Sequence, residues 1–226
     1  MDDAAVERTL AACEQGLTAG GTPDLRALGF WRAVAAVKRR RDLVDRYARR
    51  IGAIDRETFL RRVRFAVPIG VGVIVLDIGL FGGLALLAAA PALDHPWREL
   101  LVLAALGALA VTTHGLAHLA VGTFAGIDFT HWFFDARKML PPGFKVDYAS
   151  YLRASPRARA WMHASGAIVT KLVPFLVLIY ALAIDTDMWA VLVILASAIV
   201  AIVVDALFSV RVSDWKKFRR EMRFAR

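Results

Sequence analysis

Four long apolar runs dominate the pattern of hydrophobic and polar positions along the chain. They cover roughly residues 66–92, 100–124, 164–184 and 188–210. A helix rises about 1.5 Å per residue, so each run is close to the length that crosses a hydrocarbon core about 30 Å thick. A spanning segment must also satisfy its own backbone hydrogen bonds, because the bilayer offers no water to them. The pattern therefore predicts an all-α, polytopic membrane protein with four transmembrane helices.

Composition also indicates a membrane protein, and the cysteine content indicates the redox state of its compartment. Hydrophobic residues make up 58% of the chain, and the mean hydropathy of +0.52 is far above that of a soluble domain. The one cysteine, Cys13, cannot form an internal disulfide, which suits a reducing compartment. Residues 1–20 lack a short apolar region followed by a small-residue cleavage site, so we expect no removable signal peptide.

Positive charge is concentrated outside the apolar runs. The chain has 29 Lys and Arg against 20 Asp and Glu, a net charge of +9. Most of the excess lies before the first run, in a loop at 126–163 and in a basic tail at 211–226. The positive-inside rule predicts that these three segments, and hence both termini, are cytoplasmic in a cell-membrane protein. Such clustering indicates orientation against membrane lipids and not a nucleic-acid partner.

The polar segments allow fewer conclusions. Residues 1–65 are predicted to form a cytoplasmic basic helical segment, with two helical stretches separated by "TAGGTPD". Their apolar residues recur at helical spacing, which indicates either packing or contact with the membrane surface, and we favour the surface. The loop 126–163 reads as an interfacial loop rich in aromatic residues and arginine, with a possible extended pair around "FKVDYASYL".

Ionisable residues inside a span are costly, so each is a candidate functional residue. Counting about 1.5 Å per residue from the cytoplasmic ends places four of them at depths of about 8–15 Å. These four are His114, His118, Lys171 and Asp205; the fifth ionisable residue is Asp77, nearer the middle of the first span.

The two histidines lie four residues apart in "HGLAH", so both imidazoles share one helix face. A carboxylate from Asp205 at the same depth would complete three metal ligands and leave a fourth position open, the ligand set of a hydrolytic zinc site. Two alternatives stay open. The histidines could be hydrogen-bonded core residues, and Lys171 could be a counter-charge for Asp205 or Asp77.

The order of these features resembles the site-2 protease family of intramembrane metalloproteases. A His-x-x-x-His pair in one span is followed by a cytoplasmic loop, by the small-residue stretch "ASGAIVTKL" opening the next span, and by an Asp near the cytoplasmic end of the last. The resemblance covers roughly residues 100–212. It implies a transmembrane peptide or protein substrate, a loop hairpin that holds a substrate strand by β-addition, Thr170 where the family often has Asn, and Zn²⁺ bound by His114, His118 and Asp205.

The sequence departs from this family at the residue that matters most for proteolysis. Gly115 stands where the family has the Glu that performs acid–base chemistry. Glu99 cannot replace it, since it lies about 22 Å away along the helix. A desolvated Lys171, with Thr170, is a weak catalytic candidate. The loop offers three further acids, Asp128, Asp135 and Asp147.

Three hypotheses for function follow. The first is a site-2-protease-like metalloprotein, either a zinc peptidase or a catalytically degenerate relative that lacks the motif Glu. The second is a non-enzymatic membrane scaffold or binding protein whose His, Lys and Asp residues form a polar packing layer. The third is haem b held by His118 and His163, a scheme that gives His95 and His131 no role.

Overall fold

The computed structural model describes residues 1–134, 143–208 and 213–225, and most of the chain is helical. The chain divides into two compact units. The first comprises Met1–Val71, Gly122–Pro156 and the last residues from Phe224 on; the second comprises Gly72–Val121 and Arg157–Arg223. Asp135 and the end of the predicted fourth span, 209–210, lie outside the described residues.

Helices of the N-terminal segment enclose the core of the first unit. These are α1 (Asp3–Thr18), α2 (Phe30–Val37) and α3 (Arg41–Arg62), joined by the short α6 (Tyr148–Arg153). Asp2 caps α1 by accepting a hydrogen bond from the backbone N–H of Ala5. The apolar positions that recur at helical spacing face this core, among them Val6, Leu10, Cys13, Phe30, Val34, Tyr47 and Ile51. These side chains are therefore used for packing, the first of the two interpretations of this segment.

A small antiparallel sheet adds β-structure to the predicted all-α fold. Within the described residues it has three strands, β1 (Phe65–Pro68), β2 (Phe129–Phe134) and β3 (Gly143–Val146), with β2 in the centre. Phe65 pairs with Phe134, and Trp132 pairs with Phe144. Hydropathy assigned residues 66–68 to the first span because they are apolar. Their pairing with a strand more than sixty residues away cannot be deduced from the local pattern.

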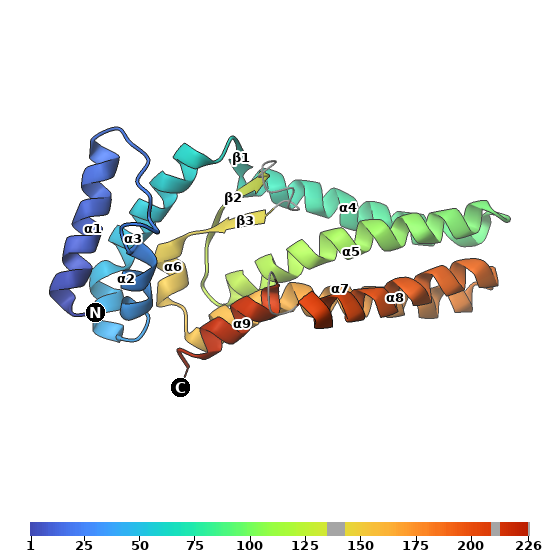
Figure 1. Cartoon of the computed structure of the whole chain (residues 1–226). Helices are drawn as coiled ribbons and strands as arrows, with labels where there is room; N and C mark the ends of the chain where they lie inside the picture. The colour runs from blue at the N-terminus through green and yellow to red at the C-terminus, as the bar shows by residue number, and fades with distance from the viewer. Residues whose placement is uncertain (135–142, 209–212, 226) are drawn as a thin grey trace. The chain divides into compact units, whose positions relative to one another are not determined.

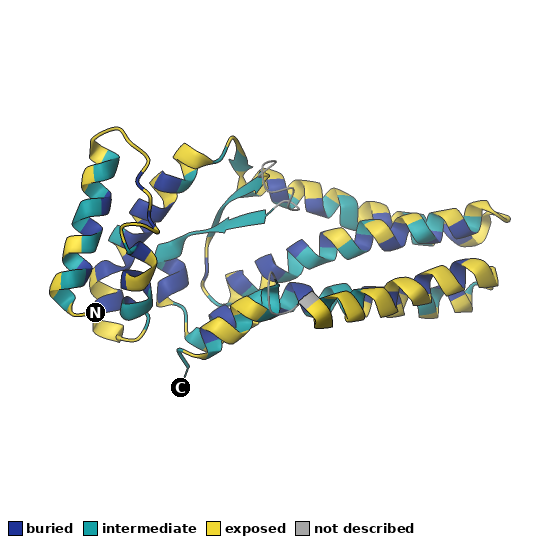
Figure 2. Cartoon of the chain, in the orientation of Figure 1, coloured by how far each residue is buried: buried dark blue, intermediate teal, exposed yellow. Residues whose placement is uncertain are grey.

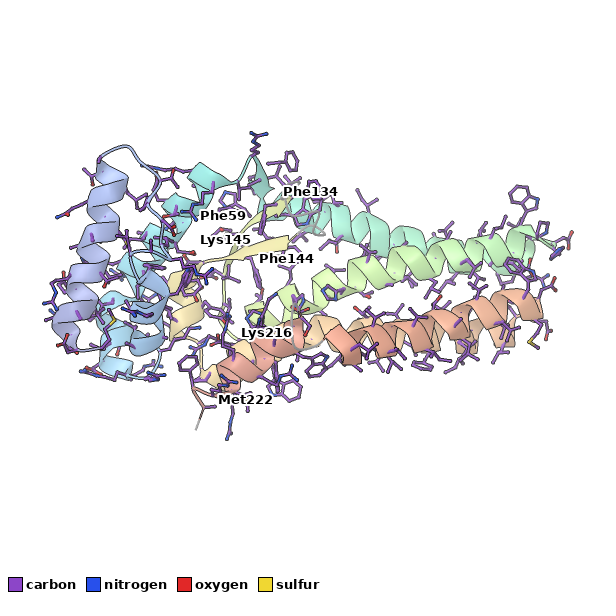
Figure 3. The ribbon with its side chains drawn as sticks, in the orientation of Figure 1. Phe59, Phe134, Phe144, Lys145, Lys216 and Met222 are labelled. Atoms are coloured by element: carbon purple, nitrogen blue, oxygen red, sulfur yellow. The ribbon has the colours of Figure 1, made fainter. Side chains whose placement is uncertain are left out.

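A buried ion pair ties β3 to α3. Lys145 Nζ is hydrogen-bonded to Asp55 Oδ2, and both side chains are largely buried. The same ammonium lies 5.0 Å from the centre of the Phe59 ring (Figure 3). Burial raises the pKa of the Asp55 carboxyl, and the charge of Lys145 opposes that rise. Each charge is tolerated here because the other is present.

The second unit is built from long helices that run side by side: α4 (Ile69–Ala89), α5 (Trp97–Phe124), α7 (Pro156–Ala183) and α8 (Met188–Phe208), followed by α9 (Asp214–Met222) (Figure 1). In the described chain, four helical segments are long and apolar enough to cross a membrane: Ile69–Ala92, Trp97–Phe124, Pro156–Ala183 and Met188–Leu207. The four predicted spans are thus confirmed as candidates, consistent with a multi-pass membrane protein. However, the predicted loop 126–163 extends too far, because α7 already begins at Pro156.

Buried and exposed residues alternate along the long helices (Figure 2). Apolar side chains occur among both the buried and the exposed residues. Inside, the core includes Val102, Leu106, Leu109, Val173, Val177 and Ile194. Outside, Ile78, Phe81 and Ile179 are each more than 60% exposed. A helix that is hydrophobic all round is typical of a membrane span, where hydrocarbon covers the outer face.

Two glycines bring α4 close to α5. A Cβ atom at Gly79 would lie 2.4 Å from Thr112 Cγ2, and one at Gly83 would lie 2.8 Å from Leu109 Cγ. Small residues four positions apart allow helix backbones to approach, which favours association in lipid through van der Waals contact.

We predict that Asp55→Asn lowers the free energy of unfolding of the first unit by about 3 kcal/mol, because it leaves the Lys145 ammonium buried without a counter-charge. Thermal unfolding of the purified protein in detergent measures the change. Replacing both partners, Asp55→Leu with Lys145→Met, should restore most of the loss. Glu57→Gln, which breaks an exposed pair with Arg61, is the control and should have little effect. Equal melting temperatures for Asp55→Asn and Glu57→Gln would contradict the role of the pair.

Candidate metal centre

His114 and His118 lie one turn apart on α5, and α7 holds both of their Nδ1 atoms. His118 Nδ1 is 2.6 Å from the carbonyl oxygen of Met162, so it must carry the proton and donate. His114 Nδ1 is 2.8 Å from Thr170 Oγ1, whose own proton is donated to the carbonyl oxygen of Gly166. Thr170 therefore accepts from His114. In both neutral imidazoles, the lone pair is left on Nε2.

The two Nε2 atoms converge on a carboxylate. They lie 3.2 Å from each other, and Oδ2 of Asp214 is 3.2 Å from His118 Nε2 and 3.6 Å from His114 Nε2. Three acceptor atoms thus meet at one point. Acceptors repel one another unless a cation, either a proton or a metal ion, lies among them. These three residues form one of the two groups in the described chain whose candidate ligand atoms all lie within 4.8 Å of one another.

Helix α9 places Asp214 beside the histidine pair. Ser213 caps its N-terminus through the backbone N–H of Lys216, and Asp214 is its first residue. Near the other end, Glu221 Oε2 lies 2.9 Å from Nε of Arg159 on α7, and both side chains are almost fully buried. The rings of Phe218 and Trp161 also meet edge to face. The N-terminus of α9 is thereby held in front of the histidine pair.

Asp214 is a carboxylate at neutral pH. Burial raises its pKa, but a hydrogen bond from His118, when a proton lies between the two groups, and the charge of Lys217 lower it more, so that the pKa lies below its ordinary value. Lys217 Nζ is 3.0 Å from Oδ1, which leaves Oδ2 directed at the imidazoles. The side chain is 15% exposed.

Asp205, the third ligand predicted from the sequence, is directed elsewhere. Its Oδ2 lies 2.5 Å from Lys171 Nζ and accepts a hydrogen bond from Trp215 Nε1 at 2.6 Å. Lys171 is therefore the counter-charge of Asp205, one of the two alternatives weighed for this lysine. Counting residues along the spans put Asp205 at a depth similar to that of the histidines, and it does line the same cavity as His114. Its carboxylate, however, pairs with Lys171. The carboxylate beside the histidines is Asp214, in the basic tail, whose charge was used only to assign the orientation.

Gly166 makes room for the centre. A Cβ atom at this position would lie 2.4 Å from His118 Nε2. The small-residue stretch "ASGAIVTKL" thus lets α7 pass close enough to α5 for Met162 and Thr170 to hold the imidazoles. Thr170, predicted as a weak catalytic candidate, acts here as a support for His114.

Among the described residues, the acids considered as replacements for the missing Glu do not belong to the group of candidate ligands around His114 and His118. Glu99 lies at the opposite end of α5. Asp128 and Asp147 belong to the first unit, where Asp147 caps α6 by accepting from the N–H of Ser150. Asp135 is outside the described residues. His114 and Asp214 also occupy the space in front of His118 Nε2 that a haem would need.

An open cavity of about 910 Å³ adjoins the centre. His114, Thr170, Lys171, Asp205 and Asp214 line it, together with basic residues of α9. The face of the centre that protein ligands leave free is therefore accessible to a small molecule.

Comparison with protein-family models, with curated proteins and with solved structures gives no match for this chain. The resemblance to site-2 proteases thus rests on the residues and their order alone.

We predict that Gly166→Ala destabilises the protein. Gly→Ala inside a helix normally stabilises by about 1 kcal/mol, but here the new methyl group would displace the His118 imidazole, and overpacking costs about 1–3 kcal/mol. The melting temperature in detergent with EDTA should therefore fall. Gly107→Ala, on α5 where a Cβ would meet nothing within 4 Å, is the matched control and should leave it unchanged or higher. A rise for both variants would show that α5 and α7 are not in close contact at Gly166.

Proposed function

We propose that this chain is a membrane metalloprotein with a site-2-protease-like centre, in which His114, His118 and Asp214 bind Zn²⁺. The observation that carries the proposal is the convergence of three acceptor atoms, with both imidazole protons directed away from the common point. Two imidazoles and one carboxylate are a ligand set that Zn²⁺ accepts readily, with a fourth position left for a small ligand.

The surroundings of the centre support a metal ion in preference to a shared proton. Metal-binding histidines usually donate their second N–H to a carbonyl or another acceptor, which fixes the tautomer and the ring orientation. Met162 and Thr170 serve this purpose here. When bound, Zn²⁺ would supply Lewis-acid polarisation of a group in the adjoining cavity.

The position of the centre on α5 and the charge pattern together suggest the orientation. The basic segments that precede α4, link α5 to α7 and form α9 are assigned to the cytoplasm by the positive-inside rule. In the proposed arrangement, both termini and the metal centre lie at the cytoplasmic side of the cell membrane.

We further propose that the chain is a degenerate relative that does not cleave peptide bonds by the mechanism of the family. Gly115 supplies no acid–base group, and amide cleavage needs a proton donor for the departing nitrogen. Asp205, which lines the same cavity, is already paired with Lys171, and Glu221 near the other end of α9 is paired with Arg159. A lysine that serves as the counter-charge of Asp205 is poorly suited to proton transfer.

Zinc analysis of the purified protein tests the centre. We expect one equivalent of zinc to be lost when His114→Ala or Asp214→Asn is introduced, since each removes one of three protein ligands. Asp205→Asn is the control and should retain it. Loss of that zinc in Asp205→Asn but not in Asp214→Asn would restore Asp205 as the ligand. A wild-type protein whose zinc content does not depend on His114, His118 or Asp214 would favour the non-enzymatic scaffold with a polar packing layer.

Peptide hydrolysis tests the second part. Zinc-loaded protein in detergent, incubated with transmembrane peptides, should give no cleavage products above those of His118→Ala. Cleavage that disappears in both His118→Ala and Asp214→Asn would identify an active peptidase and exclude the degenerate relative.

A further inference from the structure

A second cluster of ligating side chains lies at the opposite end of the long helices. It joins the connection before α5 to the connection between α7 and α8. His95 Nδ1 is 2.7 Å from Asp187 Oδ2 and 3.4 Å from Glu99 Oε2. One atom from each of the three side chains lies within 4.8 Å of the other two. Glu99 and His118 are nineteen residues apart on α5, about 28 Å along the helix axis, so this cluster is separate from the centre described above.

Glu99 has an unsatisfied buried oxygen that points into this cluster. Its side chain is only 2% exposed. Oε1 accepts a hydrogen bond of 3.3 Å from the backbone N–H of Asp187, which lies just before α8. Oε2 is buried and accepts no hydrogen bond from the part of the chain that the structure describes. A buried carboxylate oxygen that accepts no hydrogen bond is costly unless a positive charge lies beside it. Either a protonated His95, 3.4 Å away, or a bound metal cation would remove that cost.

The backbone around the cluster is held in place without a metal ion. Arg98 Nε donates to the carbonyl oxygen of Leu93 at 3.1 Å. Its Nη1 lies 3.4 Å from the carbonyl oxygens of both Ile184 and Asp185. One guanidinium therefore fixes the two connections relative to each other, which keeps the ligands pre-arranged. Side chains of His95 and Asp187 are 59% and 49% exposed, so an ion can enter from solvent and reach Glu99 beneath them.

We propose that His95, Glu99 and Asp187 form a binding site for a divalent transition-metal ion. One imidazole nitrogen with two carboxylate oxygens suits Zn²⁺ and neighbouring metals better than Mg²⁺ or Ca²⁺, which prefer oxygen ligands only. The two carboxylates balance the charge of the ion. The ion joins the two connections, and on the proposed orientation it lies on the side of the membrane opposite the first centre.

Zinc titration of the full chain in detergent tests this site. We use a background that carries both His118→Ala and Asp214→Asn, so that two of the three ligands of the first centre are removed and the result does not depend on it. Zinc should bind, and Glu99→Gln should weaken binding by more than about tenfold, since even changes outside the ligand shell cost about 10- to 100-fold. Gln keeps the oxygen that accepts from Asp187 N–H. His95→Gln, at an exposed position, should weaken binding similarly and serves if Glu99→Gln does not fold.

The matched control is Asp94→Asn, which removes a carboxylate from the same connection at a residue outside the cluster. It should leave the affinity unchanged. Zinc should also raise the melting temperature of this background protein but not that of the same protein carrying His95→Gln. The proposal is overturned if no zinc binds in this background, or if Asp94→Asn weakens binding as much as Glu99→Gln. Equal affinity with and without Glu99 would also overturn it, because Glu99 would then not be a ligand of the ion.

Discussion

The ion pair between Arg159 and Glu221 determines where the last helix of the chain lies. Removing two charges from water costs several kcal/mol per ion, and only close, well-oriented partners recover it. Here the atoms meet at 2.9 Å with exposures of 2% and 0%, so water reaches neither charge, and Glu221 Oε1 also accepts from Arg220 Nε at 3.2 Å. The pair fixes the far end of α9 against the start of α7, and edge-to-face contact of Trp161 with Phe218 adds to it. Because Asp214 and Glu221 lie on one continuous helix, Asp214 at its first position is placed by an interaction seven residues away.

The sequence predicted the features of the fold that depend on local composition and on regular helix geometry. Four apolar runs of sufficient length identified the candidate spans, and the spacing of His114 and His118 identified a shared helix face. Both depend on the rise and period of a helix, which every helix has in common. Of the extended pair expected around "FKVDYASYL", only the part within Gly143–Val146 is a strand, and the rest of that stretch forms α6. Strand β1 was not predicted, because four apolar residues at the start of a span look like helix. Its partner is remote in sequence, and hydropathy carries no information about that pairing.

The carboxylate of the centre, Asp214, could not be predicted from the rise and period of a helix, for a different reason. Counting residues along a span gives depth, and depth correctly grouped Asp205 with the histidines. It does not give direction around the helix or the charge that a side chain will meet first, which for Asp205 is Lys171. Asp214 lies after the last span, where depth counting does not apply. The available signal was Ser213 followed by Asp214, a typical start of a helix, which indicated that the basic tail folds as a separate element.

The arrangement of α9 also has a consequence for the order in which the protein is made. The two histidines are synthesised about a hundred residues before Asp214, and three more apolar or amphipathic helices must follow before the carboxylate reaches them. A chain halted anywhere before residue 214 has both imidazoles but lacks the anion that completes the group. The three groups therefore come together only after α8 and α9 have been translated, inserted and packed. A complete centre is thus present only in a fully folded helical unit.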